Sequence, residues 1–450
     1  MAQCRAPVFE TLKHKRKLNT MKTKILAAFL AGALALANAQ DKSILETLVK
    51  KGTISEQEAA QIAKDRVVVT PSSPDAKVLT IGGGVDVWYS WGSQQVKSPS
   101  SGPRVNTNGF ELRYVKVDFG AEIIGGWTAR VVTDFGSEGQ KRNYLDTVVI
   151  SKKIAFDYLL GTLDVGMRKV NMGLEQGIND FDLLTIERSV ATWFFTRPDI
   201  GDGLLGVSRA KNFGSRAIGA FWDGAVEQVD GLTYGAAVVG GNSYEGTSAK
   251  LANYDGNNNL SFYANVAYAS EAQLKDETFT YKVGLNYGYA NGAYVRGGNE
   301  NYAVWGVNPY VSLNWRGATV MLEYFLQRVD NGNYSSGEDA TPQGFNATIA
   351  YKFDIGDWGK LEPVFRASMI ATDGMGFNPV TMGAFSTPGG VDNLYNRAQT
   401  YYIGANWYVI PSVKVGVGYE WGEYTDKVSA AQTDNRAISN TVRASLQVLF

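Results

Sequence analysis

The sequence predicts an all-β protein, a closed antiparallel transmembrane β-barrel of about sixteen strands. Three observations support this fold class. Many segments alternate apolar and polar residues, as expected for a β-strand with one apolar face and one polar face. The connections between them alternate between short and long. The composition is rich in Gly, Tyr and Trp, at 50, 24 and 10 of 450 residues, and only 19% of the residues are charged, below the usual share in soluble domains.

Residues 1–39 are expected to be a leader that ends in a signal peptide over 21–39. Lys22 and Lys24 precede a short apolar run, and Ala37-Asn38-Ala39 follows it as a small-residue cleavage site. Translation can begin at Met1 or at Met21. Cleavage would remove the single Cys and the single His of the chain, so the exported protein could not use disulfides for its stability.

Residues 40–77 are expected to form a short periplasmic helical segment followed by a linker. Ile44, Leu45, Leu48 and Val49 recur at helical spacing, and the run Ser55-Glu56-Gln57-Glu58 has the pattern of a capping box. Two interpretations stay open, a solvated helical hairpin and a stalk that holds oligomers together.

The predicted barrel occupies residues 78–450. In its last strand Val442, Ala444, Leu446 and Val448 alternate with polar residues, whereas residues 110–119 have no clearly apolar face. The predicted strands are 78–91, 109–123, 126–136, 143–153, 157–169, 213–223, 231–241, 259–270, 278–290, 303–315, 318–329, 343–355, 359–371, 397–409, 412–424 and 438–450.

Short turns at 124–125, 314–317, 356–358 and 410–411 alternate with long polar loops. Outer-membrane barrels alternate short periplasmic turns with long outward loops, and a soluble sandwich has no reason to sort its loops in this way. The longest connection, 170–212, is too long for an ordinary loop. Folded into a wide lumen, it would form the constriction of a channel.

Several motifs resemble those of the phosphate-selective porin O and P family. They are Gly166–Glu175, Thr185-Ile186-Glu187-Arg188-Ser189, Arg197-Pro198-Asp199-Ile200-Gly201 and the N-terminal Leu48–Ala59. The resemblance implies a homotrimeric channel in the outer membrane whose third outward loop narrows the pore. It also implies a preference for anions such as phosphate.

Side chains that line a lumen set ion selectivity through their summed field. The residues expected at the constriction or in contact with ligand are Arg130, Arg168, Glu187, Arg188, Arg197, Arg366, Lys414 and Arg443. Inward positions also carry acids such as Asp134 and Glu420, so mixed signs predict weak anion preference at best. Arg188 and Arg197 are the strongest candidates for binding an oxyanion, and the alternative is that they hold the loop to the wall.

The expected function is passive diffusion of small hydrophilic solutes or anions, with no catalytic residues, cofactor or metal. The expected partners are membrane lipid, lipopolysaccharide and two further copies of the chain, and no nucleic acid. Two alternatives remain, a plugged structural or adhesive barrel and an outer-membrane enzyme. The second is disfavoured because a chain without His cannot assemble a Ser-His-Asp relay.

Overall fold

The computed structural model describes residues 76–98, 105–137, 144–156, 159–196, 207–208, 213–214, 216–240, 260–274, 277–296, 300–333, 336–377, 395–428 and 435–450. The predicted leader, nearly all of the helical segment and Arg197 lie outside these residues. Two compact units divide the chain, one of 1–80 and 120–125 and one of 81–119 and 126–450. Of the small unit, the structure describes only residues 76–80 and 120–125. Within the described residues, no helix is long and apolar enough to cross a membrane.

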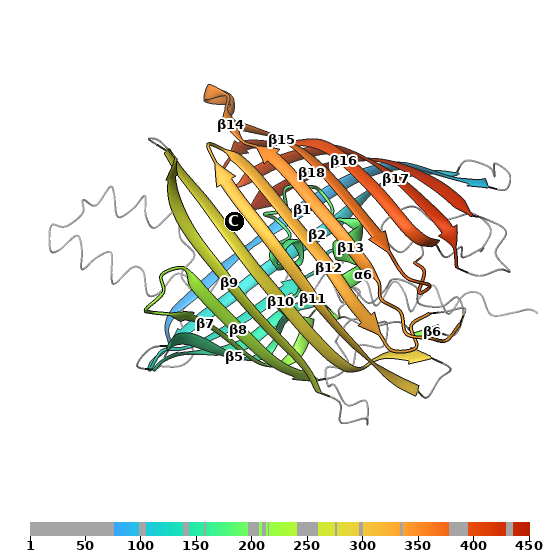
Figure 1. The fold of residues 1–450 in the computed structure, drawn as a ribbon. Coiled ribbons are helices and arrows are strands. Elements are labelled where there is room, and N and C mark those ends of the chain that lie inside the picture. Colours follow the sequence, from blue (N-terminus) through green and yellow to red (C-terminus); the bar gives the residue numbers. More distant parts are fainter. Residues whose placement is uncertain are drawn as a thin grey trace, which may run out of the picture. The chain divides into compact units, whose positions relative to one another are not determined.

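The large unit is an antiparallel sheet whose strands follow one another along the chain (Figure 1). Its strands are β1 (Ala76–Ser98), β2 (Val105–Ile123), β3 (Trp127–Asp134), β4 (Leu145–Ala155), β5 (Leu159–Lys169), β6 (Val207–Ser208), β7 (Arg216–Val226), β8 (Leu232–Gly240), β9 (Leu260–Leu274), β10 (Glu277–Arg296), β11 (Glu300–Trp315), β12 (Ala318–Val329), β13 (Gln343–Tyr351), β14 (Phe353–Asp354), β15 (Lys360–Ala371), β16 (Tyr395–Ile410), β17 (Val413–Lys427) and β18 (Arg436–Leu449).

The sheet closes on itself because β1 pairs with both β2 and β18. β13 and β14 both pair with β15 and together make one interrupted strand, and β6 only adds two residues beside β10. The ring therefore has sixteen strands, and the predicted closed barrel is confirmed. At the seam the buried carboxylate of Asp86 accepts hydrogen bonds from Ser445 (2.7 Å) and Gln447 (2.9 Å) of β18.

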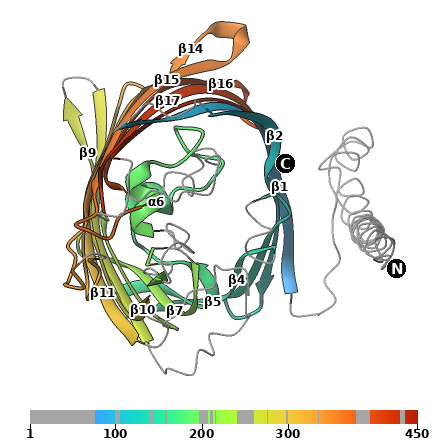
Figure 2. The ribbon, with the colours of Figure 1, turned by 90° about the vertical axis from the view of Figure 1, so that its right-hand side faces the viewer.

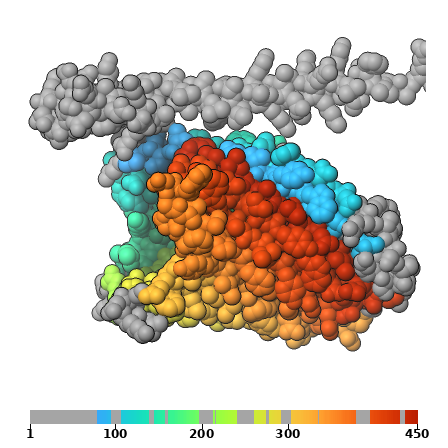
Figure 3. All heavy atoms as spheres, turned by 90° about the horizontal axis from the view of Figure 1, so that it is seen from above, coloured from blue at the N-terminus to red at the C-terminus, as the bar shows by residue number. Residues whose placement is uncertain are grey.

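The outer face of the barrel is apolar. In β18, Val442, Leu446 and Val448 are exposed while the polar residues between them are buried, as the alternation predicts. Figure 3 shows β15 to β18, orange to red, running side by side across one outer face. Such an apolar surface is compatible with contact to lipid. The closed ring is needed as well, because lipid offers no hydrogen-bond partner to an open strand edge.

Several strands differ from the sequence prediction. β1 extends to Ser98 and β10 to Arg296, so the outward loops that follow them are shorter than expected. In β2 the consecutive side chains of Arg113 and Tyr114 are both buried, while Phe110 and Leu112 are exposed. The inward parity shifts by one residue at this point, which explains why residues 110–119 show no single apolar face.

Residues 170–196, which follow β5, lie inside the ring, as Figure 2 shows for helix α6 (Val190–Thr196). A shorter helix, α5 (Leu174–Gly177), precedes α6. In α6, Phe195 stacks on Phe325 of β12 with ring centroids 5.0 Å apart. Gly344 of β13 makes room for it, since a Cβ there would lie 2.5 Å from the Phe195 ring. We call residues 170–196 the inner loop.

Candidate functional site

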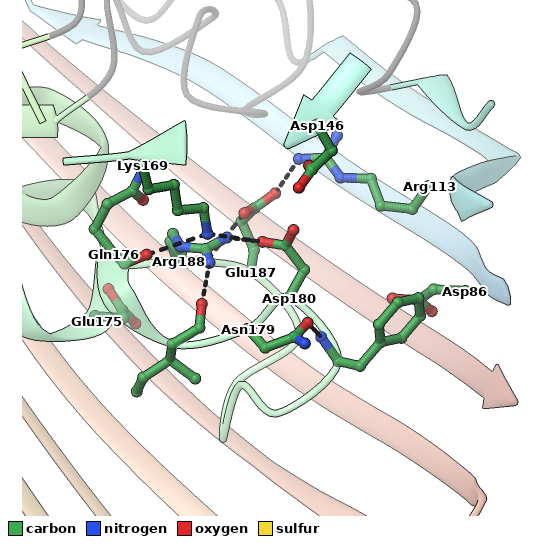
Figure 4. Close-up of polar contacts among 12 residues, drawn as sticks. Asp86, Arg113, Asp146, Lys169, Glu175, Gln176, Asn179, Asp180, Glu187 and Arg188 are labelled. Atoms are coloured by element: carbon green, nitrogen blue, oxygen red, sulfur yellow. Dashed lines mark hydrogen bonds and ion pairs between the residues drawn. The ribbon is translucent and has the colours of Figure 1, made fainter. Parts of the chain in front are cut away.

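The inner loop is attached to the barrel wall by buried charged groups (Figure 4). Glu187 of the loop accepts a 2.6 Å hydrogen bond from Arg113 of β2. From another part of the wall Arg366 of β15 donates to the backbone oxygen of Glu187 (2.5 Å) and to Thr185 (2.8 Å), and it pairs with Glu175 at 3.3 Å. Because Arg366 is only 1% exposed, it serves the loop and not the solvent.

Asp180 is the centre of a second group of contacts. Arg188 pairs with it at 2.6 Å, Lys116 of β2 also binds it, and Lys169 of β5 lies 3.8 Å away. Burial by itself would raise the pKa of Asp180, but these cations and Arg216 hold it well below its usual range. Asp180 is therefore ionised at neutral pH.

Arg188 is 2% exposed, and its second Nη donates to the backbone oxygen of Ile178 at 2.8 Å. Burial alone would lower its pKa, but the Asp180 carboxylate overrides this and raises the pKa above its ordinary value. Both contacts are with residues of the loop itself, so Arg188 braces the loop internally, and neither predicted role, oxyanion binding or attachment to the wall, is seen in these contacts.

A third attachment uses a buried carboxylate with no cationic partner in the described part of the chain. Glu323 of β12 accepts from the backbone N–H of Leu174 (2.8 Å) and from the hydroxyl of Thr192 (3.3 Å), both in the loop. From the wall, Asn346 donates at 3.2 Å and Asn308 at 3.4 Å. The carboxylate thus holds both α5 and α6 against β12.

Two further contacts complete the attachment. Lys414 of β17 donates to the backbone oxygens of Phe181 (2.7 Å) and Leu183 (3.1 Å). Glu420 of β17 lies between Arg366 and Arg443, at 3.2 Å from each. The predicted residues Glu187, Arg188, Arg366 and Lys414 therefore meet at the loop, and Arg443 joins them through Glu420.

On the side of β4 to β11 the loop leaves a cavity of about 750 Å³. Its lining is mostly uncharged, a mixture of polar side chains, glycines and aliphatic residues, and its charged members are Lys153, Lys282 and Asp223. Asp223 is paired with Arg168 of β5. Among the described residues neither lysine has an ion-pair partner, although Lys282 lies 5.8 Å from the centre of the Tyr310 ring. The free charge of the cavity is therefore positive.

A ring of strands with an inward-folded loop and a polar cavity beside it is the geometry of a diffusion channel. The sequence profile of the family described as phosphate-selective porin O and P matches residues 84–450. The chain belongs to this family. It is an outer-membrane porin, a channel for the passive diffusion of small hydrophilic solutes, and the predicted family, function and location are confirmed.

Solved outer-membrane proteins resemble the porin over most of its length. OprB of Pseudomonas putida has 11% identity and a TM-score of 0.49, over 82% of this chain and 94% of that one. OmpF of Salmonella typhi has 16% identity and a TM-score of 0.46, over 84% and 99%. OmpT of Vibrio cholerae has 11% and 0.45, over 84% and 99%. No curated protein matches the sequence.

The remaining predicted site residues of the porin lie apart from the loop contacts. Arg168 lies beside the cavity, where it also pairs with Asp164 at 3.0 Å. Arg130 of β3 is half exposed and pairs with Asp118 at 2.5 Å. In the described part of the chain, no three His, Cys, Asp or Glu side chains are grouped so as to hold a metal ion.

Sequence reasoning did not single out Lys153, Asn171 or Asn265 of the cavity. Lys153 is the last residue of a predicted strand, and its parity with Val149 and Ser151 would have placed it inward. Asn171 and Asn265 carry no charge, and nothing in their spacing distinguishes them from other polar strand residues. The cavity could be recognised only once the position of the loop was known.

Proposed function

We propose that solutes cross the membrane through the cavity between the inner loop and the wall of β4 to β11. One observation carries this proposal. Buried charged groups of β2, β12, β15 and β17 hold the loop, whereas a cavity with few charged residues stays open on the side of β4 to β11. On this proposal Glu187, Arg188, Arg366, Lys414 and Arg443 shape the constriction by fixing the loop.

We infer a weak preference for anions, carried by Lys153 and Lys282. Most other inward cations are neutralised locally, as Arg113 is by Glu187 and Lys116 by Asp180. Paired charges contribute little to the field along a pore at physiological salt. The family description names phosphate, and two free lysines favour anions without providing a continuous row of cations.

We further propose that transport involves no chemical step and no cofactor. Supporting this, a chain that has lost the leader over 1–39 contains no His and no Cys for a catalytic centre. The proposal also includes export through the signal peptide 21–39 and a periplasmic segment over 40–77. The barrel over 78–450 would assemble as a homotrimer in lipid and lipopolysaccharide.

Single-channel recording in a planar bilayer tests the route and the ion preference together. Under a potassium chloride gradient, the wild-type reversal potential should indicate a permeability ratio slightly in favour of chloride. Lys153→Gln with Lys282→Gln should move the ratio toward unity or to cation preference. Lys360→Gln, an exposed residue near the turn before β15, should leave it unchanged.

Two results would contradict the proposal. A barrel plugged by its own loop would give no current steps. A reversal potential that is unaffected by the lysine substitutions would place the ion route elsewhere.

A further inference from the structure

Three asparagines line the cavity beside the inner loop. Asn171 follows β5, Asn265 lies in β9 and Asn286 in β10. The Nδ2 group of Asn171 donates to Oδ1 of Asp223 and to Oδ1 of Asn265, both at 2.9 Å. The Nδ2 group of Asn286 donates to Oδ1 of Asn308 at 2.9 Å. These bonds fix the three amides against the wall.

The same bonds leave other amide atoms available to a solute. Oδ1 of Asn286 and Nδ2 of Asn265 form no hydrogen bond with the described residues, and neither is a buried atom without a partner. A wall that offers both acceptors and donors suits hydroxyl groups, which donate and accept. Phosphate carries strong negative charge and chiefly accepts, so the amide oxygens and Asp223 are poor partners for it.

The size and apolar content of the cavity fit the same class of ligand. Its volume of about 750 Å³ lies within the range of roughly 300–1,000 Å³ of small-molecule sites. Tyr310 of β11 contributes an aromatic ring to the lining. The ring offers an apolar surface beside the amides, and a sugar presents C–H faces as well as hydroxyl edges.

We propose that this part of the passage is a binding subsite for neutral polyhydroxylated solutes of the size of a mono- or disaccharide. Asn265 and Asn286 are its specificity-determining residues, and the lysines set only the preference among ions. The inference rests on the proposed route through the cavity and names the solute class that the route favours.

The test is block of the single-channel potassium chloride current by maltose. Maltose that dwells in the subsite should reduce the current in a saturable way. Replacing Asn265 or Asn286 with Ala should raise the half-blocking concentration about three- to tenfold, the loss expected for one or two net hydrogen bonds. Asn314→Ala, near the end of β11 and absent from the cavity lining, should leave it unchanged.

The wild-type measurement needs no variant, so a folding defect cannot hide a failure. Current steps without saturable block by maltose would overturn the inference and leave the channel function intact. An absence of current steps would instead count against the proposed function. Block by inorganic phosphate at lower concentration than maltose, abolished by Lys282→Gln and unaffected by Asn286→Ala, would also overturn the inference.

Discussion

Arg366 of β15 donates a 2.5 Å hydrogen bond to the backbone oxygen of Glu187, which lies 179 residues earlier in the chain. The same guanidinium contacts Glu175 of the inner loop and Glu420 of β17. One side chain thus joins the wall to the inner loop. Among the described residues of β15, Arg366 is the one charged side chain that pairs with the loop, and on the proposed function such contacts set the width of the passage.

Replacing Arg366 with Met should destabilise the barrel and loosen the loop. Removing one partner of a buried ion pair leaves the other charge uncompensated, at a cost of about 3–5 kcal/mol. We expect a lower unfolding midpoint in detergent and noisier single-channel currents. Arg328→Ala removes an exposed pair with Asp339 and should change the midpoint little. Equal effects of the two substitutions would contradict the assigned role of Arg366.

Asp180 should make part of the stability depend on pH. Its pKa in the folded state is lowered well below the usual value, so its ionisation stabilises the fold. This contribution is complete above the unfolded pKa of about 3.9 and is lost as pH falls through the lower folded pKa.

The stability difference between wild type and Asp180→Asn should therefore be constant between neutral pH and about pH 5 and shrink below about pH 4. Denaturant unfolding at a series of pH values measures it. A difference that disappeared already near neutral pH would show that Asp180 has no such stabilising partners.

Gly344→Leu should displace α6. A Cβ at this position would lie 2.5 Å from the Phe195 ring and 3.2 Å from both Ile370 and the backbone of Met369, so a larger side chain has no room. We expect a higher or unstable single-channel conductance, because α6, which narrows the lumen on the proposed function, can no longer pack against β13. Gly109→Ala, where nothing lies within 4 Å, is the matched control. A conductance equal to that of the control would show that α6 does not narrow the passage.

Asp86→Ala should weaken the seam between β1 and β18. It leaves Ser445 and Gln447 without their acceptor in a buried position, and an unsatisfied buried polar group costs about 1–3 kcal/mol. The loss is measured by incubating samples at a series of temperatures and determining the fraction of folded barrel that remains on a denaturing gel run without boiling. Val442→Ala on the lipid side should leave these contacts intact, and a greater loss there than at Asp86 would contradict the prediction.

Much of the fold could be predicted because alternation is a local property. Six or seven residues, from Val442 to Val448, were enough to show which face of the last strand is apolar. The regular succession of short and long connections was also visible in the sequence alone. The region around Arg113 and Tyr114 could not be predicted, since a single shift of parity makes both faces look mixed.

The site was less accessible to sequence reasoning. A guanidinium in an inward position binds a solute or a carboxylate depending on which residue lies opposite, and for Arg188 that residue is Asp180, within its own loop. For Glu187 the partner is Arg113, 74 residues earlier. No pattern of spacing gives such pairs, so inward charge could be predicted but not its neutralisation.

The hydrogen bond that Ser445 donates to Asp86 joins residues that are 359 positions apart. Pairing at such separation is slow to form because a very long loop must be closed first. Until β18 arrives, β1 presents a row of unpaired backbone groups that would attach to any other strand it met. The open edge of β1 is therefore the part of the folding chain most exposed to pairing with a second molecule, until β18 covers it.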